Sequence, residues 1–361
     1  MIKQFRSIAI FIFTWICLTA CRQEQVDDFP NGNLDFVSAV DISNFPEIDE
    51  TNAVFLDING NQKDFLDIIK SSGVNTVRLR IWVNPTSQHS GFNEVKEFST
   101  KLRSMGFKIW LTVHYSDTWA DPAHQITPLA WNNLDFQSLQ KEVSEYTLRI
   151  VTEIKPDYIQ IGNEINPGFL HPQGNIVEQY SNFIALMTSA INVVRKETPK
   201  AKIIIHYAGI EGAAWFYNQV APLDYDMIGI SYYPIWHGKS LNNLKNELTT
   251  LALTHNKEIV IAETAYPFTL EWNDWTNNIV GEEEQLILPE FPASTEGQRA
   301  FIQSLRNMME EIPNGKGLCY WGAELIAWKG NQANNASPWE NQALFNFQNQ
   351  ALPAMGDLKK D

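Results

Sequence analysis

Two glutamates that each close a short apolar run are the residues best suited to chemistry in this sequence. Glu164 ends the segment Tyr158–Glu164, and Glu263 ends the segment Ile259–Glu263. Burial penalises the charged form of a carboxylate, so these are poor positions for a purely structural role. Parallel α/β barrels, in contrast, build their active sites at the C-terminal ends of strands. The two residues therefore predict a glycosidase pair, one acid/base and one nucleophile, whereas the alternative is two core glutamates satisfied by Arg or Lys.

Three further residues are expected to support this pair. Asn163 can donate an amide hydrogen bond to a sugar 2-hydroxyl, although a strand-end cap explains it equally well. Arg80 lies near the end of the second predicted strand and is expected to hold Glu263 ionised, because a nearby guanidinium lowers the pKa of a carboxyl. Arg78 has the same parity one layer deeper, so we expect it to form a structural ion pair. Tyr232, after the sixth predicted strand, is expected to orient the nucleophile through a hydrogen bond.

Aromatic and polar residues cluster after the third, sixth and eighth predicted strands. A single residue of this kind is more often used in packing, but aromatic faces also stack on sugar rings. Their clustering at one barrel mouth favours a carbohydrate cleft with Trp119 as its stacking platform. The expected substrate-binding residues are His114, Asp117, Trp119, Trp236, His237 and Trp321, with Trp328 and Trp339 as extensions of the cleft.

No metal or cofactor is expected to take part in this chemistry. His114, His206 and His237 lie on different predicted strands and show no paired metal-ligand spacing. A two-carboxylate mechanism needs no metal. The sequence also contains no phosphate-binding loop, no dinucleotide fingerprint and no serine nucleophile elbow.

Short β-branched runs alternate with amphipathic helical patterns from residue 33 onward. One such pattern is the stripe of Leu139, Val143, Tyr146 and Ile150, which repeats at helical spacing. Eight alternating units predict an α/β fold, a (β/α)₈ TIM barrel with carboxylates at the ends of strands four and seven. A doubly wound open sheet is the rival, but no glycine-rich turn follows the first strand. The expected strands are Phe36–Asp41, Thr76–Ile81, Lys108–Val113, Tyr158–Ile161, Lys202–His206, Met227–Ser231, Ile259–Ala262 and Gly317–Trp321.

Length and charge limit the organisation and the partners of the chain. Its 361 residues contain no Pro/Gly/Ser-rich linker between the alternating units, so we expect one catalytic domain over 33–355 and a polar tail over 356–361. The net charge of −15 argues against nucleic acid or an anionic membrane surface as partner, since both demand a basic face. A neutral polysaccharide is compatible with this charge, and nothing demands more than a monomer.

The N-terminus has the pattern of a bacterial lipoprotein signal. Lys3 and Arg6 precede an apolar stretch, Ile8–Leu18, that is too short to span a bilayer. The residues Leu18–Cys21 resemble a lipoprotein cleavage box, which predicts a signal peptide over 1–20, lipidation of Cys21 and a flexible tether over 21–32. An ordinary signal peptide with a chance cysteine is the alternative. We therefore expect an exported protein anchored in the outer membrane. The acidic residues just after Cys21 resemble the surface-export signals of some bacterial lipoproteins, which favours the cell surface. The one other cysteine of the mature chain, Cys319, lies in an apolar strand and predicts a core residue without a disulfide.

Six segments together resemble glycoside hydrolase family 53, the endo-β-1,4-galactanases. The similarity covers nearly all of residues 36–347. The segments are Val77–Pro85, His114–Pro122, Ile161–Asn166, Ser231–Gly238, Glu263–Pro267 and Trp339–Phe345. This resemblance implies a retaining enzyme that cuts internal β-1,4-galactosyl bonds in galactan and type I arabinogalactan, the side chains of pectin. It also implies that Glu164 is the proton donor and Glu263 the nucleophile.

The sequence departs from the family at two places. Family members often carry Tyr-Trp-Glu-Pro after strand eight, whereas Gly322, Ala323 and Glu324 follow Trp321 here. Some bacterial members bind calcium in the loop after strand seven through alternating Asp, Asp, His and Asn ligands. The corresponding residues here are Glu271, Asn273, Trp275 and Asn277, and because an indole cannot ligate calcium, that site is not predicted in its usual form.

Two other functions remain open at this point. A related retaining endo-β-glycanase would act on mannan, xylan or glucan, and analysis of the products from each polymer distinguishes it. A non-catalytic glycan-binding lipoprotein would use the barrel only as a scaffold, but the presence of both glutamates argues against it.

Overall fold

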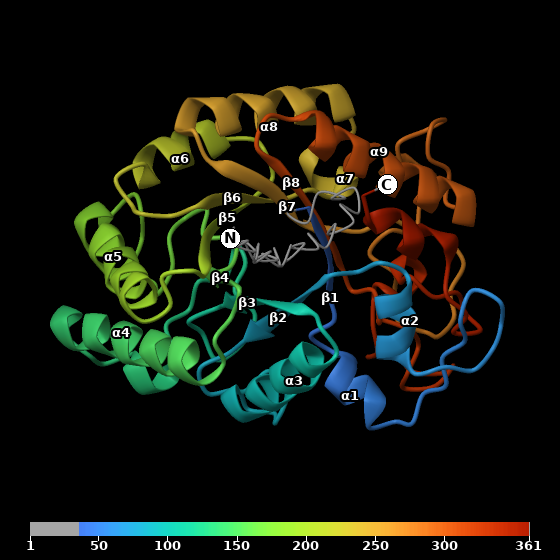
Figure 1. Cartoon of the computed structure of the whole chain (residues 1–361), viewed down its shortest axis with the longest axis horizontal. Helices are drawn as coiled ribbons and strands as arrows, with labels where there is room; N and C mark the ends of the chain where they lie inside the picture. The colour runs from blue at the N-terminus through green and yellow to red at the C-terminus, as the bar shows by residue number, and fades with distance from the viewer. Residues whose placement is uncertain (1–35, 361) are drawn as a thin grey trace, which may run out of the picture. The chain divides into compact units, whose positions relative to one another are not determined.

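The computed structural model describes residues 36–360, in which eight parallel strands close into a barrel in the order β1 to β8 (Figure 1). The strands are β1 Val37–Asp41, β2 Thr76–Ile81, β3 Lys108–Val113, β4 Tyr158–Ile161, β5 Lys202–Ala208, β6 Met227–Ser231, β7 Glu258–Thr264 and β8 Gly315–Trp321. The predicted (β/α)₈ barrel is confirmed. The expected signal peptide 1–20, the lipidated Cys21 and the tether 21–32 lie outside the described residues.

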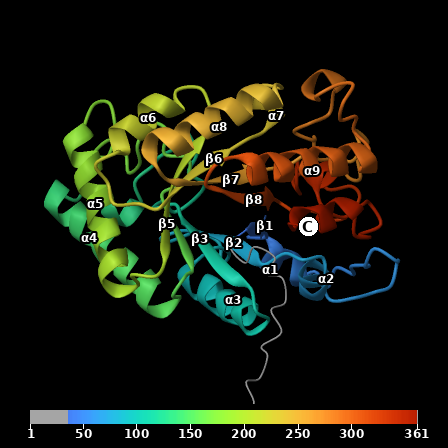
Figure 2. The same cartoon turned by 45° about the horizontal axis from the view of Figure 1, so that its top comes forward.

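Helices surround the barrel on its outer face (Figures 1 and 2). Polar side chains cap the N-terminal ends of several of them. Asp64 accepts hydrogen bonds from the backbone N–H groups of Leu66 and Asp67, and Asp135 and Ser294 cap the helices that begin at Phe136 and Thr295. The helices are α1 Phe45–Asp49, α2 Phe65–Ser71, α3 Phe92–Ser104, α4 Phe136–Glu153, α5 Tyr180–Glu197, α6 Ala213–Val220, α7 Pro234–His237, α8 Leu241–His255 and α9 Thr295–Glu311. Within residues 36–360, no helix combines the length and apolar character needed to cross a membrane.

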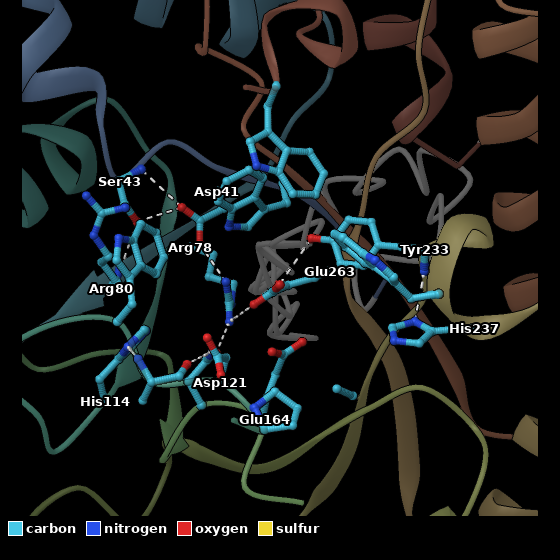
Figure 3. A pocket seen from close by; sticks show the side chains of 18 residues that line it. Asp41, Ser43, Arg78, Arg80, His114, Asp121, Glu164, Tyr233, His237 and Glu263 are labelled. Atoms are coloured by element: carbon cyan, nitrogen blue, oxygen red, sulfur yellow. Dashed lines mark hydrogen bonds and ion pairs between the residues drawn. The ribbon is translucent and has the colours of Figure 1, made fainter. Parts of the chain in front are cut away.

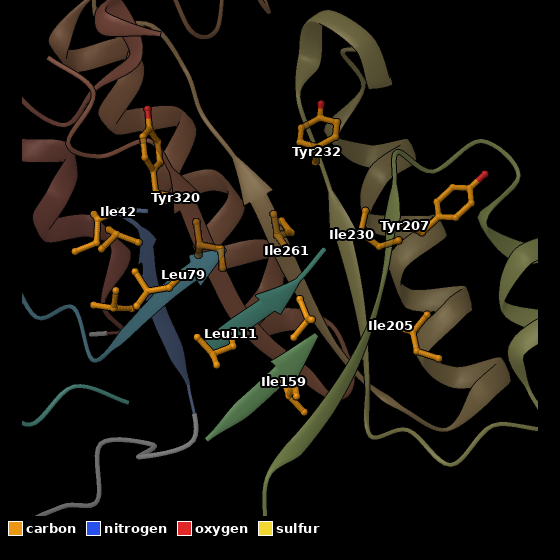
Figure 4. Packing of buried hydrophobic residues seen from close by; sticks show 14 of the residues in the cluster. Ile42, Leu79, Leu111, Ile159, Ile205, Tyr207, Ile230, Tyr232, Ile261 and Tyr320 are labelled. Carbon is orange, nitrogen blue, oxygen red and sulfur yellow. The ribbon is translucent and has the colours of Figure 1, made fainter. Parts of the chain in front are cut away.

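Alternation along the strands separates an outer from an inner set of side chains. Outward residues such as Leu79, Leu111 and Ile261 pack beneath the helices in the larger core (Figure 4). Inward residues form a smaller apolar cluster that fills the barrel interior. Its members are Val37, Ala39, Trp110, Tyr158, Ile204, Met227, Val260, Ala262 and Cys319, whose thiol is free.

A polar layer begins where the same inward positions carry polar side chains. Arg78, Gln160 and His206 continue the inward parity of β2, β4 and β5, and all three are buried. Glu263 does not follow that rule, since Val260 and Ala262 are the inward residues of β7. The register between β6 and β7 shifts between Ile261 and Glu263. Such an irregularity re-aims a side chain, and here it turns the Glu263 carboxylate into the barrel.

The domain extends beyond the boundary expected at residue 355. The segment expected to be a polar tail, 356–361, is packed through Leu358, whose side chain is fully buried. Ser38 Oγ donates a hydrogen bond to the Leu358 carbonyl (2.8 Å), and Arg299 pairs with Asp357 (2.7 Å). The polar composition of this stretch suggested a solvent-exposed tail, but its one large apolar residue, Leu358, packs into the domain next to β1.

Candidate active site

Arg78 lies at the centre of the polar layer above the inner core (Figure 3). Its Nη1 donates to Asp41 Oδ2 (2.6 Å), and its Nη2 donates to Glu263 Oε1 (2.8 Å) and Asn163 Oδ1 (2.9 Å). Burial alone would lower the pKa of this guanidinium, but the charges of Glu263 and Asp41 outweigh it and raise that pKa. Arg78 is therefore a permanent cation that joins β1, β2, β4 and β7.

Glu263 receives a hydrogen bond on each carboxylate oxygen. Oε1 accepts from Arg78, and Oε2 accepts from the Tyr233 hydroxyl at 3.1 Å. Burial, with a smaller contribution from the Asp41 charge, raises the pKa of Glu263 above its usual value, and the Arg78 charge and the Tyr233 hydrogen bond oppose this rise. Because both donors favour the ionised form, this carboxylate is equipped to act as a nucleophile.

Glu164 follows β4 at the end of a tight turn. Its φ of 47° is left-handed, which is unusual for a residue other than glycine and typical of functional positions. A Cβ on Gly162 would lie 2.4 Å from Ile165 Cγ2, so the turn requires glycine there. The Glu164 side chain accepts a single hydrogen bond, from Ser231 Oγ at 2.6 Å. Burial, and then the charge of Glu263, raise the pKa of Glu164 to about 8.

The two carboxyl groups face each other across the barrel mouth. Carboxylate oxygens of Glu164 and Glu263 lie within 4.8 Å of each other. Retaining glycosidases separate their carboxyl groups by about 5–5.5 Å, whereas inverting enzymes need roughly 6.5–9.5 Å to admit a water molecule. Since the two titrate together and Glu263 holds the stronger donors, the shared proton resides on Glu164 at neutral pH. This is the division between acid and nucleophile that retaining hydrolysis requires.

A hydrogen-bonded chain leads from the barrel interior to Glu164. Gln160 Nε2 donates to His206 Nδ1 (2.9 Å), which fixes the proton of the imidazole on Nε2. His206 Nε2 then donates to Ser231 Oγ (2.8 Å), and Ser231 donates to Glu164. Burial, followed by the charge of Arg78, holds the pKa of His206 well below 6.5, so the imidazole is neutral.

A cavity of about 420 Å³ lies above the two carboxylates and is bordered by indole rings. The four rings follow one another along its border. The distances between ring centroids are 6.3 Å for Trp119 and Trp321, 4.5 Å for Trp321 and Trp339, and 5.9 Å for Trp339 and Trp236. Of the predicted substrate-binding residues, five line this cavity: His114, Trp119, Trp236, His237 and Trp321. Trp339 also lines it, whereas Trp328 does not.

Comparison with known proteins agrees with this geometry. A family model described as glycosyl hydrolase family 53 matches residues 37–358. The chain belongs to this family. It is 33% identical over 375 residues to the arabinogalactan endo-beta-1,4-galactanase of Cellvibrio japonicus, covering 98% of this chain and 97% of that protein. It is also 36% identical over 347 residues to an uncharacterized protein of Niallia circulans, covering 90% and 93% of the two chains.

A solved structure of the same family has the same architecture. The Ignisphaera aggregans GH53 catalytic domain aligns with a TM-score of 0.84 at 36% identity, covering 91% of this chain and 97% of that one. The family that the sequence motifs indicated is thereby confirmed, and this family 53 chain is a glycoside hydrolase.

The prediction that Arg80 pairs with the nucleophile Glu263 was wrong. Its Nε donates to Ser90 Oγ (2.7 Å), its Nη2 bonds Asn44, and its guanidinium lies 4.2 Å from the ring centroid of Trp119. Burial lowers the pKa of Arg80 to about 10, which still leaves a cation at neutral pH. Arg80 sits one layer nearer to solvent than Glu263, and the deeper Arg78 makes the ion pair instead.

The tyrosine assigned to the nucleophile was off by one position. The Tyr232 hydroxyl donates to the Gly238 carbonyl (2.8 Å), and its ring stacks on Phe301 behind the barrel wall. Tyr233, two residues after Ser231, keeps the inward parity and reaches Glu263. Burial raises the pKa of Tyr233 well above 10, so its hydroxyl stays protonated and remains a donor. Alternation from Ser231 onward would have identified it.

Asp117 holds two loop segments together through backbone hydrogen bonds and does not take the predicted place in the cavity. Its two carboxylate oxygens accept hydrogen bonds from the backbone N–H groups of Asn84 (3.0 Å) and Leu129 (2.8 Å), and it does not line the cavity. The predicted Asn163 does line the cavity. Its Nδ2 donates to the Ala120 carbonyl (2.8 Å) and its Oδ1 accepts from Arg78, so it ties the β3 loop to the ion pair.

The roles of Asp41, His206 and Ser231 were not predicted from the sequence. Asp41 ends β1 as a buried carboxylate, just as Glu263 ends the sequence run of β7, so the same signal was present there. Ser231 and His206 carried no signal, because a serine or histidine inside an apolar strand is not distinctive by itself.

In the loop after β7, the residues at the positions of the family's calcium ligands do not form a suitable calcium site. The Trp275 indole carries no oxygen ligand, and the Asn273 backbone N–H donates to Glu340 Oε1 (2.7 Å). Glu340, from the segment before the C-terminus, is buried and holds this loop from beneath. Over residues 36–360, only one group of three His, Cys, Asp or Glu side chains brings its ligand atoms close enough to share a metal ion. This group is Glu164, His206 and Glu263, which lie in the catalytic site itself.

Proposed function

We propose that this family 53 hydrolase is a retaining endo-β-1,4-galactanase that acts on galactan and type I arabinogalactan. The observation that carries the mechanism is the approach of the two carboxylates to within 4.8 Å, with the Arg78 and Tyr233 donors on Glu263 alone. The substrate class is supported by the relatives named for that polymer, among them the Cellvibrio japonicus enzyme, whose alignment covers 98% of this chain.

In the first step Glu263 attacks the anomeric carbon of the bound galactosyl unit. The bond to the glycosidic oxygen breaks, and Glu164 transfers its proton to that oxygen as the leaving chain departs. Glu263 then carries the sugar as an ester and has lost its charge. Arg78 is not left unpaired by this change, because Asp41 remains 2.6 Å from its Nη1.

In the second step water replaces the departed chain. Glu164, now ionised, takes a proton from this water, whose oxygen attacks the anomeric carbon and releases Glu263. The Ser231 hydroxyl donates to Glu164 at 2.6 Å and stabilises its ionised form between the two steps.

Chromatography of the products from linear β-1,4-galactan is the direct test. Short galacto-oligosaccharides that appear before galactose accumulates would support endo-cleavage. Glu263→Gln should lose activity by roughly 10⁴-fold or more while still binding the polymer. Activity on mannan, xylan or glucan in place of galactan would refute the assigned substrate. Activity of Glu263→Gln equal to that of the wild type would refute the mechanism.

We further propose that the protein is an exported lipoprotein anchored through Cys21. The support is the sequence pattern alone: the basic start, the apolar Ile8–Leu18 and the Leu18–Cys21 box. Fatty-acid labelling and membrane fractionation of the wild type and Cys21→Ser test it. Equal labelling of both proteins would refute the anchor.

A further inference from the structure

Acidic and basic residues are separated between the two ends of the barrel. The segments 68–76 and 101–108, which join α2 to β2 and α3 to β3 where the strands begin, contain no Asp or Glu. The loop 265–292, which follows β7 at the opposite end, contains six acidic residues and no Lys or Arg. The net charge of −15 does not reveal this separation, because it sums both ends of the barrel.

Six cations form one group at the N-terminal ends of β1, β2 and β3, and we call this group the basic arc. Its members, none of which is buried, are Lys70, Lys101, Arg103, Lys108, Lys359 and Lys360. Lys70 Nζ donates to the Gly106 carbonyl (2.7 Å), which joins the segment after α2 to the segment after α3. A Cβ on Gly73 would lie 2.6 Å from Lys359 Cδ, so the C-terminal segment lies against the first of these two segments.

The charges of the basic arc are not cancelled by neighbouring carboxylates. Within residues 36–360, none of its six cations forms an ion pair with an Asp or Glu side chain. Lys70 and Arg103 donate to backbone carbonyls, which are neutral partners. Lys202 and Lys316, at the starts of β5 and β8, are instead both paired with Glu258 (3.3 Å). The basic arc therefore presents a positive potential to solvent.

Helix dipoles account for only part of the basic arc. Lys70 lies in the last turn of α2, and Lys101 and Arg103 lie in the last turn of α3, where a cation is favoured by the helix dipole. The other three cations lie in β3 and in the C-terminal segment, outside the α-helices. Their position at the same end of the barrel has no explanation in helix stability.

The chain enters the domain beside the basic arc. Asn75 Nδ2 donates to the Phe36 carbonyl (2.8 Å), and the Lys108 backbone N–H donates to the Asn75 carbonyl (2.9 Å). Lys360 Nζ lies 5.9 Å from the ring centroid of Phe36. The 15 residues 21–35 join the proposed lipidation site to this point, and a chain of that length spans at most about 50 Å. A lipid anchor would therefore keep the basic arc near the bilayer.

We propose that the basic arc is the surface through which the domain docks on a membrane with anionic phosphate headgroups, an inference that rests on the proposed lipid anchor. Each Lys or Arg close to such a surface is attracted to it, and the attraction falls off within a Debye length of about 8 Å at physiological salt. The acidic loop 265–292 is repelled by the same surface. Docking thus points the barrel mouth, with Glu164 and Glu263, away from the bilayer and toward the polysaccharide.

Sedimentation of the unlipidated chain with vesicles tests this docking surface. The closed barrel lies entirely within residues 36–360, so a chain that begins at Arg22 keeps the fold. We expect it to bind vesicles of equal parts phosphatidylglycerol and phosphatidylcholine, to release them at high salt, and not to bind phosphatidylcholine alone. The triple variant Lys101→Gln/Lys108→Gln/Lys359→Gln should bind the anionic vesicles about 10- to 100-fold more weakly.

The matched control removes three exposed lysines from the mouth end of the barrel. It is the triple variant Lys63→Gln/Lys239→Gln/Lys329→Gln, which has the same net charge as the first one. This control should bind anionic vesicles at least as well as the unsubstituted chain. Equal losses in the two triple variants, or no binding of the unsubstituted chain to anionic vesicles at low salt, would overturn the proposal.

Hydrolysis of soluble galactan by the vesicle-bound chain tests the orientation. Its rate should equal that of the free chain, because the mouth points away from the bilayer. A loss of activity on binding would place the mouth against the bilayer and overturn the proposed orientation.

The acidic segment 22–35 is the alternative occupant of the basic arc, since it carries Glu24, Asp27, Asp28 and Asp35 against the single cation Arg22. Vesicle binding that appears only in a chain that begins at Phe36 would identify this segment as the occupant and overturn the proposal. None of these proteins is lipidated, so the vesicle results are independent of the labelling of Cys21. A failure of the lipid anchor and a failure of the docking surface are therefore distinguishable.

Discussion

Arg78 Nη2 lies 2.8 Å from Glu263 Oε1, deep in the barrel where neither group meets solvent freely. A buried charge is costly unless it is paired and hydrogen-bonded. Here one cation serves two carboxylates, because Asp41 pairs with the opposite end of the same guanidinium. The nucleophile can therefore exist as an anion or as a neutral ester while the cation keeps a partner in both states.

Replacing this cation should shift the acidic limb of activity. Glu263 must be ionised to attack, and Arg78 lowers its pKa. In Arg78→Lys the planar, two-ended pairing is lost, so the pKa of Glu263 rises and activity disappears at a higher pH, by about one unit or more. The measurement is kcat/KM on galactan as a function of pH. Arg80→Lys is the control and should leave the acidic limb in place, so equal shifts in both variants would contradict the assignment.

Two adjacent tyrosines offer a second matched comparison. Tyr233→Phe removes the hydroxyl donor to Glu263 Oε2 (3.1 Å) and should lower kcat by about 10- to 100-fold, as expected for a hydrogen bond to a charged group. Tyr232→Phe removes a hydrogen bond to the Gly238 carbonyl and should leave kcat close to the wild-type value. Steady-state kinetics on galactan give both numbers. A larger loss in Tyr232→Phe would restore the assignment made from the sequence.

The fold was predictable because its signals are local and repeated. The expected strands Thr76–Ile81, Lys108–Val113, Tyr158–Ile161 and Met227–Ser231 match the observed bounds, and each is a short apolar run between polar loops. Glu164 and Glu263 were found because a carboxylate at the end of such a run is unusual.

The partners of these carboxylates were harder to predict, since they depend on depth and register. Strand parity places Arg78 and Arg80 on the same inward side, but only the height of β2 relative to β7 decides which one reaches Glu263. The register shift in β7 that turns Glu263 inward has no marker in the sequence. Parity did contain the answer for Tyr233, which shares the side of Ser231.

Ser231 should tune the acid Glu164 and the second step of the reaction. Its hydrogen bond lowers the pKa of Glu164, which burial raises to about 8. Because Glu164 must be protonated in the first step, activity is lost as pH rises through this pKa. In Ser231→Ala the pKa rises further, so the basic limb of kcat/KM should move to higher pH.

The same variant should also slow hydrolysis of the glycosyl-enzyme, since ionised Glu164 loses its donor. We expect kcat to fall by about 10- to 100-fold. Ser231→Thr retains a hydroxyl and should restore both properties, and pH profiles of the three proteins make the comparison. A basic limb that stays in place in Ser231→Ala, or no recovery in Ser231→Thr, would show that the His206–Ser231 chain does not act on Glu164.

Glu324 should make stability depend on pH outside the catalytic pair. It follows β8 at the position where the sequence departs from the family, and it is 2% exposed. Its Oε1 accepts from the Asn44 backbone N–H (2.9 Å), whereas Oε2 has no hydrogen-bond partner. Burial, followed by the charge of Asp41, raises its pKa from 4.5 to about 8. Between about pH 4.5 and 8, the Glu324 carboxyl therefore keeps its proton in the folded protein but has lost it in the unfolded chain.

A carboxyl whose pKa is raised on folding destabilises the protein progressively as pH rises through that window. Glu324→Gln cannot ionise, so the difference in Tm between this variant and the wild type should grow in favour of the variant from pH 5 to pH 8. Thermal unfolding at several pH values measures it. Glu97→Gln, at an exposed position on α3, is the matched control and should not change the pH dependence of Tm. A constant difference in Tm across this range would mean that Glu324 is ionised in the folded protein, with Arg80 and the Asn44 backbone N–H sufficient to hold the charge.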